Sequence, residues 1–207
     1  MKLPEKTIER LSQYRRTLLN CHANGHTHIF SHELAALLNI TAVQVRRDIM
    51  FLGYTSAQRK GYDIKELIEV IGILLDNNDV IHVGVVGMGH LGTAISAYFR
   101  GKREKLDIVA TFDVNPEKTG KTIADVHCYS ITELNDVVRK LNISVGVITV
   151  PPEHAAEVSQ KLVTAGIKGI LNFTTVPLNV PNKVYLEEFD MITSLEKVAY
   201  FVKKQKG

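Results

Sequence analysis

The chain has 207 residues, 45% of them hydrophobic and 23% charged, with a formal net charge of +3. This composition excludes an intrinsically disordered chain, and the length favours a small domain joined to a larger one. No apolar run approaches the roughly 20 residues of a membrane-spanning helix, and the first residues are too charged for a signal peptide. We therefore expect a cytoplasmic protein with no membrane partner.

The excess positive charge lies in the first part of the chain. Residues 1–75 contain ten Lys and Arg and seven Asp and Glu, whereas residues 76–207 contain 15 of each kind. This excess is a weak indication of nucleic-acid binding, because surface charge usually only keeps a face solvated. Whether this part of the chain binds nucleic acid must therefore be judged from the arrangement of its basic residues.

Residues 1–76 predict a winged helix-turn-helix domain. Two helices separated by a tight turn are typical of a helix-turn-helix, and a glycine-containing segment with a basic pair indicates a hairpin or wing. Ser31 is the expected cap of the second helix, and Thr41 with Gln44 forms the capping-box pattern of the third. The expected helices span residues 5–22, 31–39, 41–52 and 64–75, with the wing over residues 53–64.

The third helix has the polar side chains that reading DNA requires. Its apolar stripe consists of Val45, Ile49 and Leu52. This stripe predicts that Gln44, Arg47 and Asp48 lie toward the opposite side. Arg46 and Met50 are then expected on the flanks. Arginines there can reach phosphates and base edges in a major groove, and basic wing residues can reach the backbone or minor groove. The candidate DNA-binding residues are Gln44, Arg46 and Arg47 on the helix and Arg59 and Lys60 on the wing.

Asp48 is the exception on this predicted polar face. A carboxylate facing phosphate is repelled, so Asp48 should pair with a neighbouring cation, for which Arg47 and Arg59 are the candidates. The alternative interpretation of this domain is a helical module that docks another protein and has a solvated basic face.

Residues 80–190 predict a Rossmann domain, separated from the first domain by a break at residues 76–79. Apolar strand-like segments alternate with helical patterns, which indicates a mostly parallel sheet covered on both faces. A last helix, from about Ile192 to Lys204, has no obvious place in this core. Strands are expected at 80–86, 106–113, 124–129, 145–150, 169–171 and 184–188, and helices at 91–99, 131–141 and 153–165.

A glycine motif, Gly87-Met88-Gly89-His90-Leu91-Gly92, directly follows the first of these strands and opens a helix. Gly87 permits a tight turn, Gly89 the close approach of backbone to a pyrophosphate, and Gly92 the packing of helix on sheet. The helix N-terminus would bind the diphosphate. Asp113, at the end of the next strand, should accept hydrogen bonds from ribose hydroxyls and repel a 2′-phosphate, which favours NAD(H) over NADP(H). The alternative for the glycine motif is a turn that binds no nucleotide, and the alternative for Asp113 is an ordinary aspartate at the end of a strand.

The sequence indicates no catalytic residue. Tyr98 and Lys102 have the YxxxK spacing of short-chain dehydrogenases, but they lie too early in the chain for that role. His154, in a loop after a strand, is the remaining candidate for proton transfer, although a lone loop histidine is more often structural or solvated. Because this loop borders the expected ligand crevice, we assign Val150 and Pro151 to the cofactor site.

The sequence also indicates no metal site and no disulfide framework. The two cysteines lack a CxxC spacing, and the clustered histidines lack a cysteine or carboxylate partner at a known ligand spacing. We expect plain thiols and solvated loop histidines. These residues are Cys21, Cys128, His22, His26, His28 and His32.

Taken in order, these motifs resemble the family of redox-sensing transcriptional repressors named Rex, from about Pro4 to Phe201. The resemblance implies a homodimer in which the C-terminal helix, residues 191–207, is swapped between subunits. It also implies a palindromic double-stranded operator upstream of fermentative and respiratory genes. The protein binds this operator and releases it when NADH binds, so that NADH relative to NAD+ sets how tightly the DNA is held. The matching stretches are PEKTIERLSQYRR, SHELAALLNITAVQVRRDIMFLGY, RKGYDI, VGVVGMGHLGTAI, FDVNPEKTGK, ITVPPEHAAEVSQKLVTAGIKGILNF and FDMITSLEKVAY.

The resemblance also implies roles for single residues. Arg16, Tyr98 and Asp190 match residues that couple the two domains across the dimer, and Met191 matches an apolar or aromatic residue near the nicotinamide. Three features depart from the family pattern. His90 replaces a usual Asn, Thr175 replaces a usual Pro, and the wing lacks one of the usual glycines.

Two other functions are compatible with the Rossmann domain alone. An NAD-dependent oxidoreductase would use the same glycine motif, and the stretch VPPEH to AGIKGILNFT is similar to the CoA-binding domain of acyl-CoA ligases. Neither function explains Arg46, Arg47 and the basic pair of the wing. We therefore predict a sensor without turnover rather than an enzyme.

Overall fold

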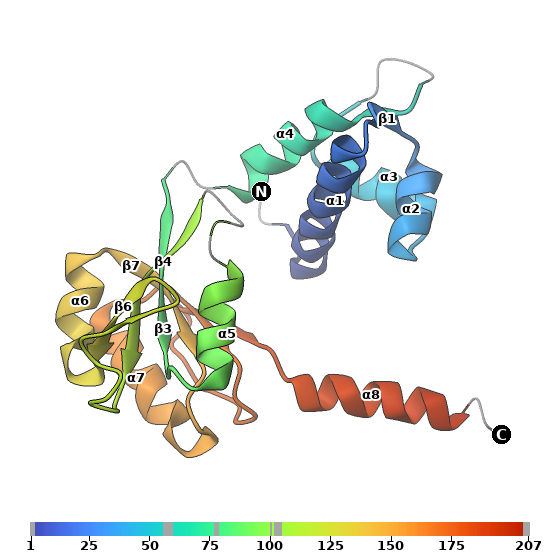
Figure 1. The fold of residues 1–207 in the computed structure, drawn as a ribbon. Coiled ribbons are helices and arrows are strands. Elements are labelled where there is room, and N and C mark those ends of the chain that lie inside the picture. Colours follow the sequence, from blue (N-terminus) through green and yellow to red (C-terminus); the bar gives the residue numbers. More distant parts are fainter. Residues whose placement is uncertain (1–2, 56–59, 77–78, 100, 102–104, 205–207) are drawn as a thin grey trace. The chain divides into compact units, whose positions relative to one another are not determined.

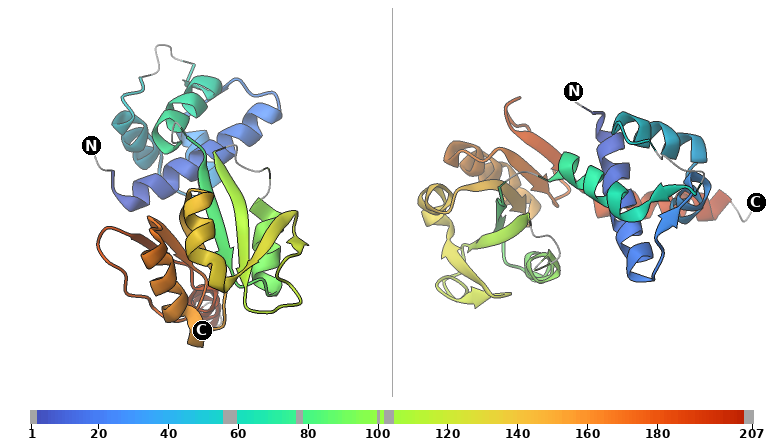
Figure 2. Two further views of the ribbon diagram at one scale, coloured as in Figure 1. Left: turned by 90° about the vertical axis from the view of Figure 1, so that its left-hand side faces the viewer. Right: turned by 90° about the horizontal axis from the view of Figure 1, so that it is seen from above.

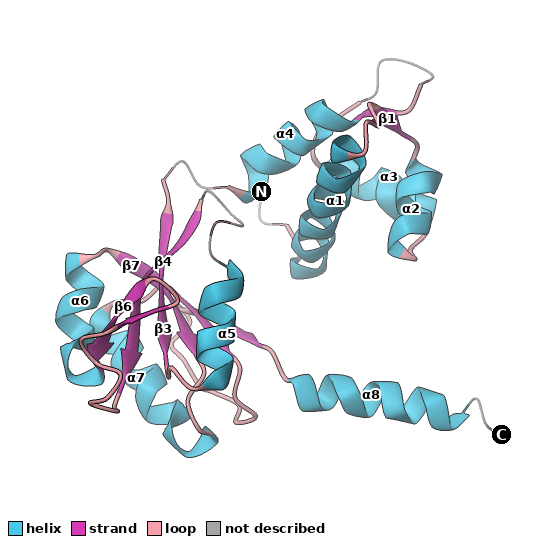
Figure 3. Ribbon diagram, viewed as in Figure 1, coloured by secondary structure: helices cyan, strands magenta, loops and turns pink. Residues whose placement is uncertain are grey.

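The computed structural model describes residues 3–55, 60–76, 79–99, 101 and 105–204, which fold as two compact units. The first unit spans Met1–Asn78 and the second spans Asp79–Gly207. Helices make up most of the first unit, whereas the second contains a sheet flanked by helices (Figures 1 and 3). Among the described residues, no helix is long and apolar enough to cross a membrane.

The described part of the first unit contains four helices and a two-stranded antiparallel sheet, which confirms the predicted helices. All four helices contribute fully buried side chains to one core, among them Leu18, Leu34, Val45 and Ile71. The tip of the predicted wing, residues 56–59, lies outside the described residues. The elements are α1 (Glu5–Ala23), β1 (His28–Ile29), α2 (Ser31–Leu38), α3 (Ala42–Phe51), β2 (Tyr62–Asp63) and α4 (Ile64–Leu75), and β1 pairs with β2.

The two predicted helix caps have different outcomes. The Thr41 hydroxyl accepts a hydrogen bond of 3.2 Å from the backbone N–H of Gln44, which confirms the cap of α3. The Gln44 side chain does not complete the expected capping box, because its amide turns to the interior of the unit. Ser31 is the first residue of α2 and not its cap. Phe30 takes the cap position, and its N–H donates to the Glu33 carboxylate at 2.7 Å.

The structure corrects the prediction for Asp48, whose side chain is fully buried in the unit. Arg10 donates to its carboxylate through Nε and Nη2 at 2.6 and 2.8 Å, the Tyr14 hydroxyl at 2.7 Å and the Gln44 amide at 2.9 Å. Burial alone raises the pKa of Asp48, but these hydrogen bonds outweigh it and hold the pKa below its ordinary value. The ion pair forms with Arg10 of α1, so the predicted pairing with Arg47 is wrong.

The second unit contains a seven-stranded sheet with the order β5-β6-β4-β3-β7-β8-β9. All neighbouring strands are parallel except β5 and β6, which confirms the mostly parallel sheet. The short strand β5 was not predicted, and the expected edge strand is β9. The strands are β3 (Ile81–Val86), β4 (Leu106–Asp113), β5 (Thr122–Ile123), β6 (Val126–Ser130), β7 (Ile143–Ile148), β8 (Gly169–Asn172) and β9 (Tyr185–Glu188).

Helices cover both faces of this sheet (Figure 2). Because side chains alternate along a strand, Val85 of β3 packs on one side with Ile95 of α5, and Val86 packs on the other with Leu162 of α7. The central strand β3 lies between β4 and β7. Its carboxyl end is therefore a switch point, where open α/β sheets bind ligands. The helices are α5 (His90–Phe99), α6 (Leu134–Lys140) and α7 (Ala155–Ala165), with 3-10 turns at Ile131–Glu133 and Pro152–His154.

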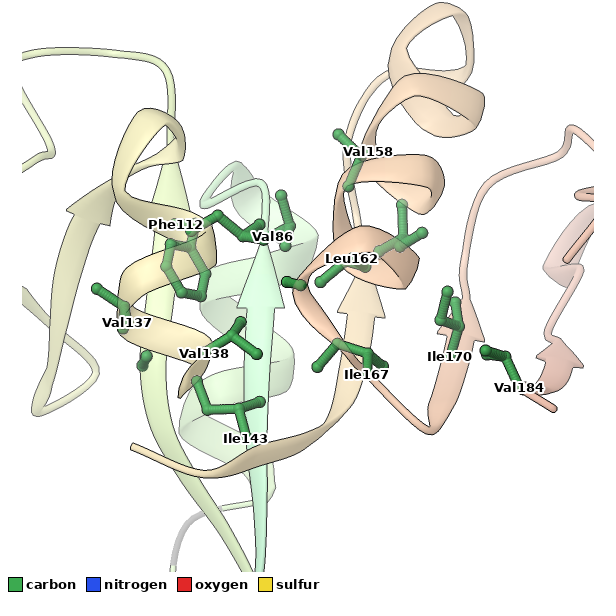
Figure 4. Packing of buried hydrophobic residues seen from close by; sticks show 14 residues of the cluster. Val86, Phe112, Val137, Val138, Ile143, Val158, Leu162, Ile167, Ile170 and Val184 are labelled. Carbon is green, nitrogen blue, oxygen red and sulfur yellow. The ribbon is translucent and has the colours of Figure 1, made fainter. Parts of the chain in front are cut away.

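Helix α7 packs tightly on the sheet because Gly146 of β7 has no side chain. A Cβ atom at Gly146 would lie 2.8 Å from Leu162 Cδ1. Val158 and Leu162 of α7 belong to the same buried cluster as Val138 of α6 (Figure 4). This packing fixes the start of α7 and the loop that precedes it.

The last helix, α8 (Met191–Lys204), has large apolar side chains that are not covered within the described chain. Their exposed fractions range from 49% to 70%. Isolated exposed apolar residues are ordinary, but a run of this kind on one helix marks an interaction surface. These residues are Met191, Ile192, Leu195, Val198, Tyr200, Phe201 and Val202.

Replacing Arg10 by Met should destabilise the first unit by about 3 kcal/mol, because it leaves a buried carboxylate without its cation. Since the pKa of Asp48 is lowered in the folded unit, this difference is fully present above the unfolded Asp pKa of about 3.9 and is lost as the pH falls through the folded-state pKa. Hydrogen exchange of the α1 and α3 amides in the full chain measures both effects. Lys6→Met, at an exposed position of the same helix, is the control. Equal protection in the two variants would contradict the role of the pair.

Candidate functional site

The loop between β3 and α5 is built around two glycines, Gly87 and Gly92, that tolerate no side chain. Gly87 has a φ of +96°, and a Cβ there would lie 2.8 Å from the carbonyl oxygen of Thr149. A Cβ at Gly92 would overlap the carbonyl oxygen of Gly87, so the first turn of α5 packs directly on the loop. At Gly89 no atom lies within 4 Å of such a Cβ. The space beside Gly89 is therefore open to a ligand.

Thr149 connects this loop to the end of β7. Its hydroxyl group lies 3.0 Å from the carbonyl oxygen of Val86 and 2.8 Å from that of Gly87, and it can donate to either of them. Its backbone N–H donates to the carbonyl oxygen of Val86 at 2.9 Å. The sequence analysis did not identify Thr149, because a threonine at a strand end carries no distinctive signal.

Asp113, at the end of β4, fixes the other side of the loop. Its carboxylate accepts hydrogen bonds from the backbone N–H groups of Met88 and Asn115, both at 2.8 Å, and from Lys118 Nζ at 3.2 Å. Only 8% of Asp113 is exposed. Burial alone raises the pKa of Asp113, but the hydrogen bonds from Asn115, Met88 and Lys118 outweigh it, and its pKa is lowered. The carboxylate is therefore ionised and holds the glycine loop.

A cavity of about 620 Å³ opens beside the glycine loop at the carboxyl end of β3. It brings together most of the residues predicted for the cofactor site, and His154 also borders it. The Met88 side chain and Gly92 do not line it, and neither does Met191 at the start of α8. The predicted residues that line it are Gly87, Gly89, His90, Leu91, Asp113, Val150 and Pro151.

The cavity also has lining residues that the sequence analysis missed, of which Lys118 matters most for charge. Lys118 lies 3.2 Å from Asp113 and compensates its negative charge. Its position in the FDVNPEKTGK stretch, five residues after the strand-end aspartate, was the available signal. The others are Val86, Val114, Ile131, Thr149, Glu157, Val158 and Lys161.

The predicted DNA-binding residues differ in accessibility. Arg46 and Arg47 are exposed on α3, where an Arg46 Nη1 donates to the Ser31 hydroxyl at 3.1 Å and the Arg47 guanidinium lies 6.0 Å from the centre of the Phe51 ring. Lys60 is exposed, and Arg59 lies outside the described residues. Gln44 is half-buried and bound to Asp48, which the sequence analysis did not foresee.

The three residues assigned to domain coupling lie on α1, on α5 and just before α8. Arg16 and Tyr98 are exposed. The Asp190 carboxylate accepts hydrogen bonds from the backbone N–H groups of Ile192 and Thr193 at 2.8 and 3.2 Å and from the Thr193 hydroxyl at 2.6 Å. Within this chain Asp190 is a helix cap, and its role in coupling stays a prediction.

The departures from the family pattern and the metal candidates occupy ordinary positions. His90, the first residue of α5, and Thr175 are exposed. Both cysteines are free thiols, and Cys128 is buried. Within the part of the chain that the structure describes, no three His, Cys, Asp or Glu side chains are grouped so that they could hold a metal ion.

Gly92→Ala should destabilise the second unit by about 3 kcal/mol or more, because the new methyl group would overlap a backbone oxygen that cannot move away cheaply. Gly89→Ala is the matched control, because its methyl group meets no atom. Its stability should stay within about 0.5 kcal/mol of the wild type. Thermal unfolding of the full chain measures both, and similar losses in the two variants would contradict this packing.

Comparison with known proteins gives two family models. The model described as "CoA binding domain" matches residues 78–176, and the model described as "Putative DNA-binding protein N-terminus" matches residues 2–49. The two matches fall on the two units of the structure.

Curated relatives match nearly the whole chain. The redox-sensing transcriptional repressor Rex of Carboxydothermus hydrogenoformans is 40% identical over 204 residues, which are 98% of each chain. The protein of the same name from Geobacillus kaustophilus is 36% identical over 202 residues, covering 98% of this chain and 94% of the relative.

Solved structures of the Rex-family repressor RSP match the whole fold. The complex of RSP with β-NAD+ and operator DNA has a TM-score of 0.91 and 30% identity, covering 100% of this chain and 95% of RSP. The complex with β-NADH has a TM-score of 0.88 and 29% identity, covering 100% and 97%. With its motifs, fold and full-length relatives in agreement, the chain belongs to the family of redox-sensing transcriptional repressors named Rex.

Proposed function

We propose that this protein represses transcription by binding operator DNA through its first unit, and that NADH in the cavity of its second unit releases it. The observation that supports this most strongly is the full-length similarity to RSP, whose solved complexes contain β-NAD+ with operator DNA and β-NADH. Gene expression then follows the ratio of NADH to NAD+. Because its proposed partner is genomic DNA, we place the protein in the cytoplasm.

The glycine loop and cavity of the second unit are the proposed NAD(H) site. The diphosphate would bind the backbone of the loop Gly87–Gly92 at the start of α5, with Gly89 leaving it room. Asp113 would accept a ribose hydroxyl at Oδ1, because Met88 and Lys118 both donate to Oδ2, only Asn115 donates to Oδ1, and a carboxylate has about four acceptor sites. Val150 and Pro151 would contact the cofactor at the end of β7. The family resemblance adds Met191 near the nicotinamide.

The exposed basic residues of α3 and the wing are the proposed DNA contacts. Arg46 and Arg47 extend from a capped helix and form no ion pair with the described residues of the unit. They suit phosphates and guanine edges in a major groove, with Arg59 and Lys60 of the wing on the flanking backbone or minor groove.

A homodimer with swapped α8 helices is the proposed assembly. The apolar side chains of α8 are 49% to 70% exposed in the single chain, and contact with a second copy would remove them from water. In this assembly Arg16, Tyr98 and Asp190 are the proposed coupling residues between subunits. Two copies of α3 would then meet successive major grooves of a palindrome.

Catalysis is not part of the proposal. The cavity offers His154 as a proton carrier, but His154 is exposed, and the relatives named above are repressors. The alternatives are an NAD-dependent oxidoreductase and a CoA-binding protein, the latter supported by the family model that matches residues 78–176. Hydride transfer by the protein, or tighter binding of acyl-CoA than of NADH, would favour these alternatives.

A titration of operator DNA with NADH and with NAD+ tests the proposed function. NADH should lower operator affinity by roughly fivefold to 150-fold relative to NAD+ at one fixed salt concentration. By linkage, operator DNA must lower the affinity for NADH relative to that for NAD+ by the same factor, which calorimetry can measure independently. Operator binding that does not respond to NADH would rule out a redox sensor, and unequal factors would mean that the two ligands do not share one equilibrium.

Asp113→Ala should weaken NADH binding and narrow the preference for NADH over NADPH, because it removes a ribose acceptor and a source of repulsion. The contact with Lys118 adds a second expectation. Lys118→Ala leaves the Asp113 charge uncompensated, so discrimination against the 2′-phosphate of NADPH should increase. Dissociation constants of both dinucleotides measure the two variants, with Asp107→Ala, exposed on the same strand, as control. An unchanged ratio in Asp113→Ala would remove Asp113 from the selectivity of the site.

A further inference from the structure

The buried carboxylate of Asp48 uses its two oxygens differently. Oδ2 accepts from Arg10 Nε at 2.6 Å and from the Tyr14 hydroxyl at 2.7 Å. Oδ1 accepts from Arg10 Nη2 at 2.8 Å and from Gln44 Nε2 at 2.9 Å. Three of these four donors come from α1 and serve to attach α3 to it. The fourth comes from Gln44 on α3 itself, four residues earlier.

A hydrogen bond to a carboxylate determines which way a glutamine amide faces. An ionised carboxylate only accepts hydrogen bonds, so the Gln44 group directed at Asp48 must be the NH2 and not the carbonyl. The lowered pKa of Asp48 keeps it ionised near neutral pH. One N–H of the amide is thereby used, and the second N–H and the Oε1 atom stay available. Among the described residues, Oε1 has no hydrogen-bond partner.

Gln44 lies in the part of α3 that meets bases in helix-turn-helix proteins. It is the third residue of the helix, and its backbone N–H binds the Thr41 cap. Recognition helices contact base edges with their N-terminal residues. A glutamine amide that offers an N–H and a carbonyl oxygen side by side matches the N7 and N6 positions of adenine.

Resting on the proposed operator binding, we infer that Asp48 is a positioning residue that orients the Gln44 amide to recognise adenine in the major groove. The buried carboxylate acts through Gln44 and does not touch DNA. An apolar residue could join α3 to α1 as well as this ion pair does, since well-packed apolar replacements of buried pairs are often neutral or stabilising. An apolar residue could not, however, determine whether the NH2 group or Oε1 of the Gln44 amide faces the interior.

A selection from a random duplex pool, performed with the full-length protein and NAD+, tests this inference. The wild type should prefer adenine at one position of each half-site, by about fivefold to a hundredfold over the other bases. Gln44→Leu should lose the preference at that position alone. If the wild type selects no sequence, the proposed function fails; if it selects a site that Gln44→Leu leaves unchanged, the inference fails.

Asp48→Asn tests the orientation itself. The asparagine oxygen should occupy the Oδ2 position, which accepts the two shorter hydrogen bonds, from Arg10 Nε and the Tyr14 hydroxyl. Its NH2 group should then face Gln44 and give up the hydrogen bond from Arg10 Nη2. The Gln44 amide should then turn over, so that its Oε1 accepts from the asparagine NH2 group. Its own N–H groups then lie where Oε1 had been. The adenine preference should then be lost, because the amide would present an N–H toward the adenine amino group and Oε1 toward N7, a donor against a donor and an acceptor against an acceptor. An adenine preference that persists in folded Asp48→Asn would overturn the inference.

Tyr14→Phe is the matched control. It removes a hydrogen bond from the same buried carboxylate, but on Oδ2, away from Gln44. Its stability should fall while its base preferences stay those of the wild type. A changed preference at the Gln44 position in Tyr14→Phe would mean that loosening α3, and not amide orientation, determines the base.

The side-chain amide of Gln44 gives a second measurement that needs no folded Asp48 variant. In the operator-free wild type, one of its Nε2 protons should exchange with water more slowly than those of Gln13, which is exposed on α1. The Gln44→Leu spectrum identifies the resonance by its loss. Exchange of both Gln44 protons at the rate of Gln13 would refute a fixed amide.

Discussion

An ionised aspartate buried beneath the functional element is the constraint on which each unit depends. In the second unit, Asp113 accepts the Met88 N–H and so fixes the glycine loop to the end of β4. In the first, Asp48 accepts from α1 and from Gln44 and so fixes α3. Both carboxylates lose solvation on burial, and both have lowered pKa values because hydrogen bonds outweigh that loss. Each aspartate therefore fixes the position of a functional element, although its own side chain is buried.

The elements with periodic patterns could be predicted from the sequence, and so could the glycine loop. Helix α4 begins and ends at the predicted residues because Asp63 caps it and apolar residues recur at helical spacing. Gly87 and Gly92 were assigned their structural roles because close backbone approach permits no other residue. The short strands β1 and β5, of two residues each, have too little pattern to be recognised, whereas β2 lies within the predicted wing.

Asp48 shows why side-chain partners were harder to predict than elements. Its position on α3 follows Val45 by three residues and precedes Ile49, so it borders the buried stripe, but a carboxylate is normally assigned to solvent. Only the fold shows that Arg10 of α1, 38 residues earlier, meets it. Lys118 was missed for a similar reason, since its contact with Asp113 depends on how the loop after β4 turns back.

The ion pairs of the first unit also restrict how an effector could act on DNA binding. Asp48 attaches α3 to α1, and Arg15 of α1 forms two hydrogen bonds, of 2.7 and 2.6 Å, with Asp76 at the end of α4. The helix proposed to read DNA is thus connected through α1 to the last described residue before the chain leaves the unit. Breaking either connection would leave a charge with little solvent. In the proposed homodimer, a change in the second unit would therefore move the first as a rigid body, altering the spacing of the two proposed recognition helices on a palindrome without reshaping either one.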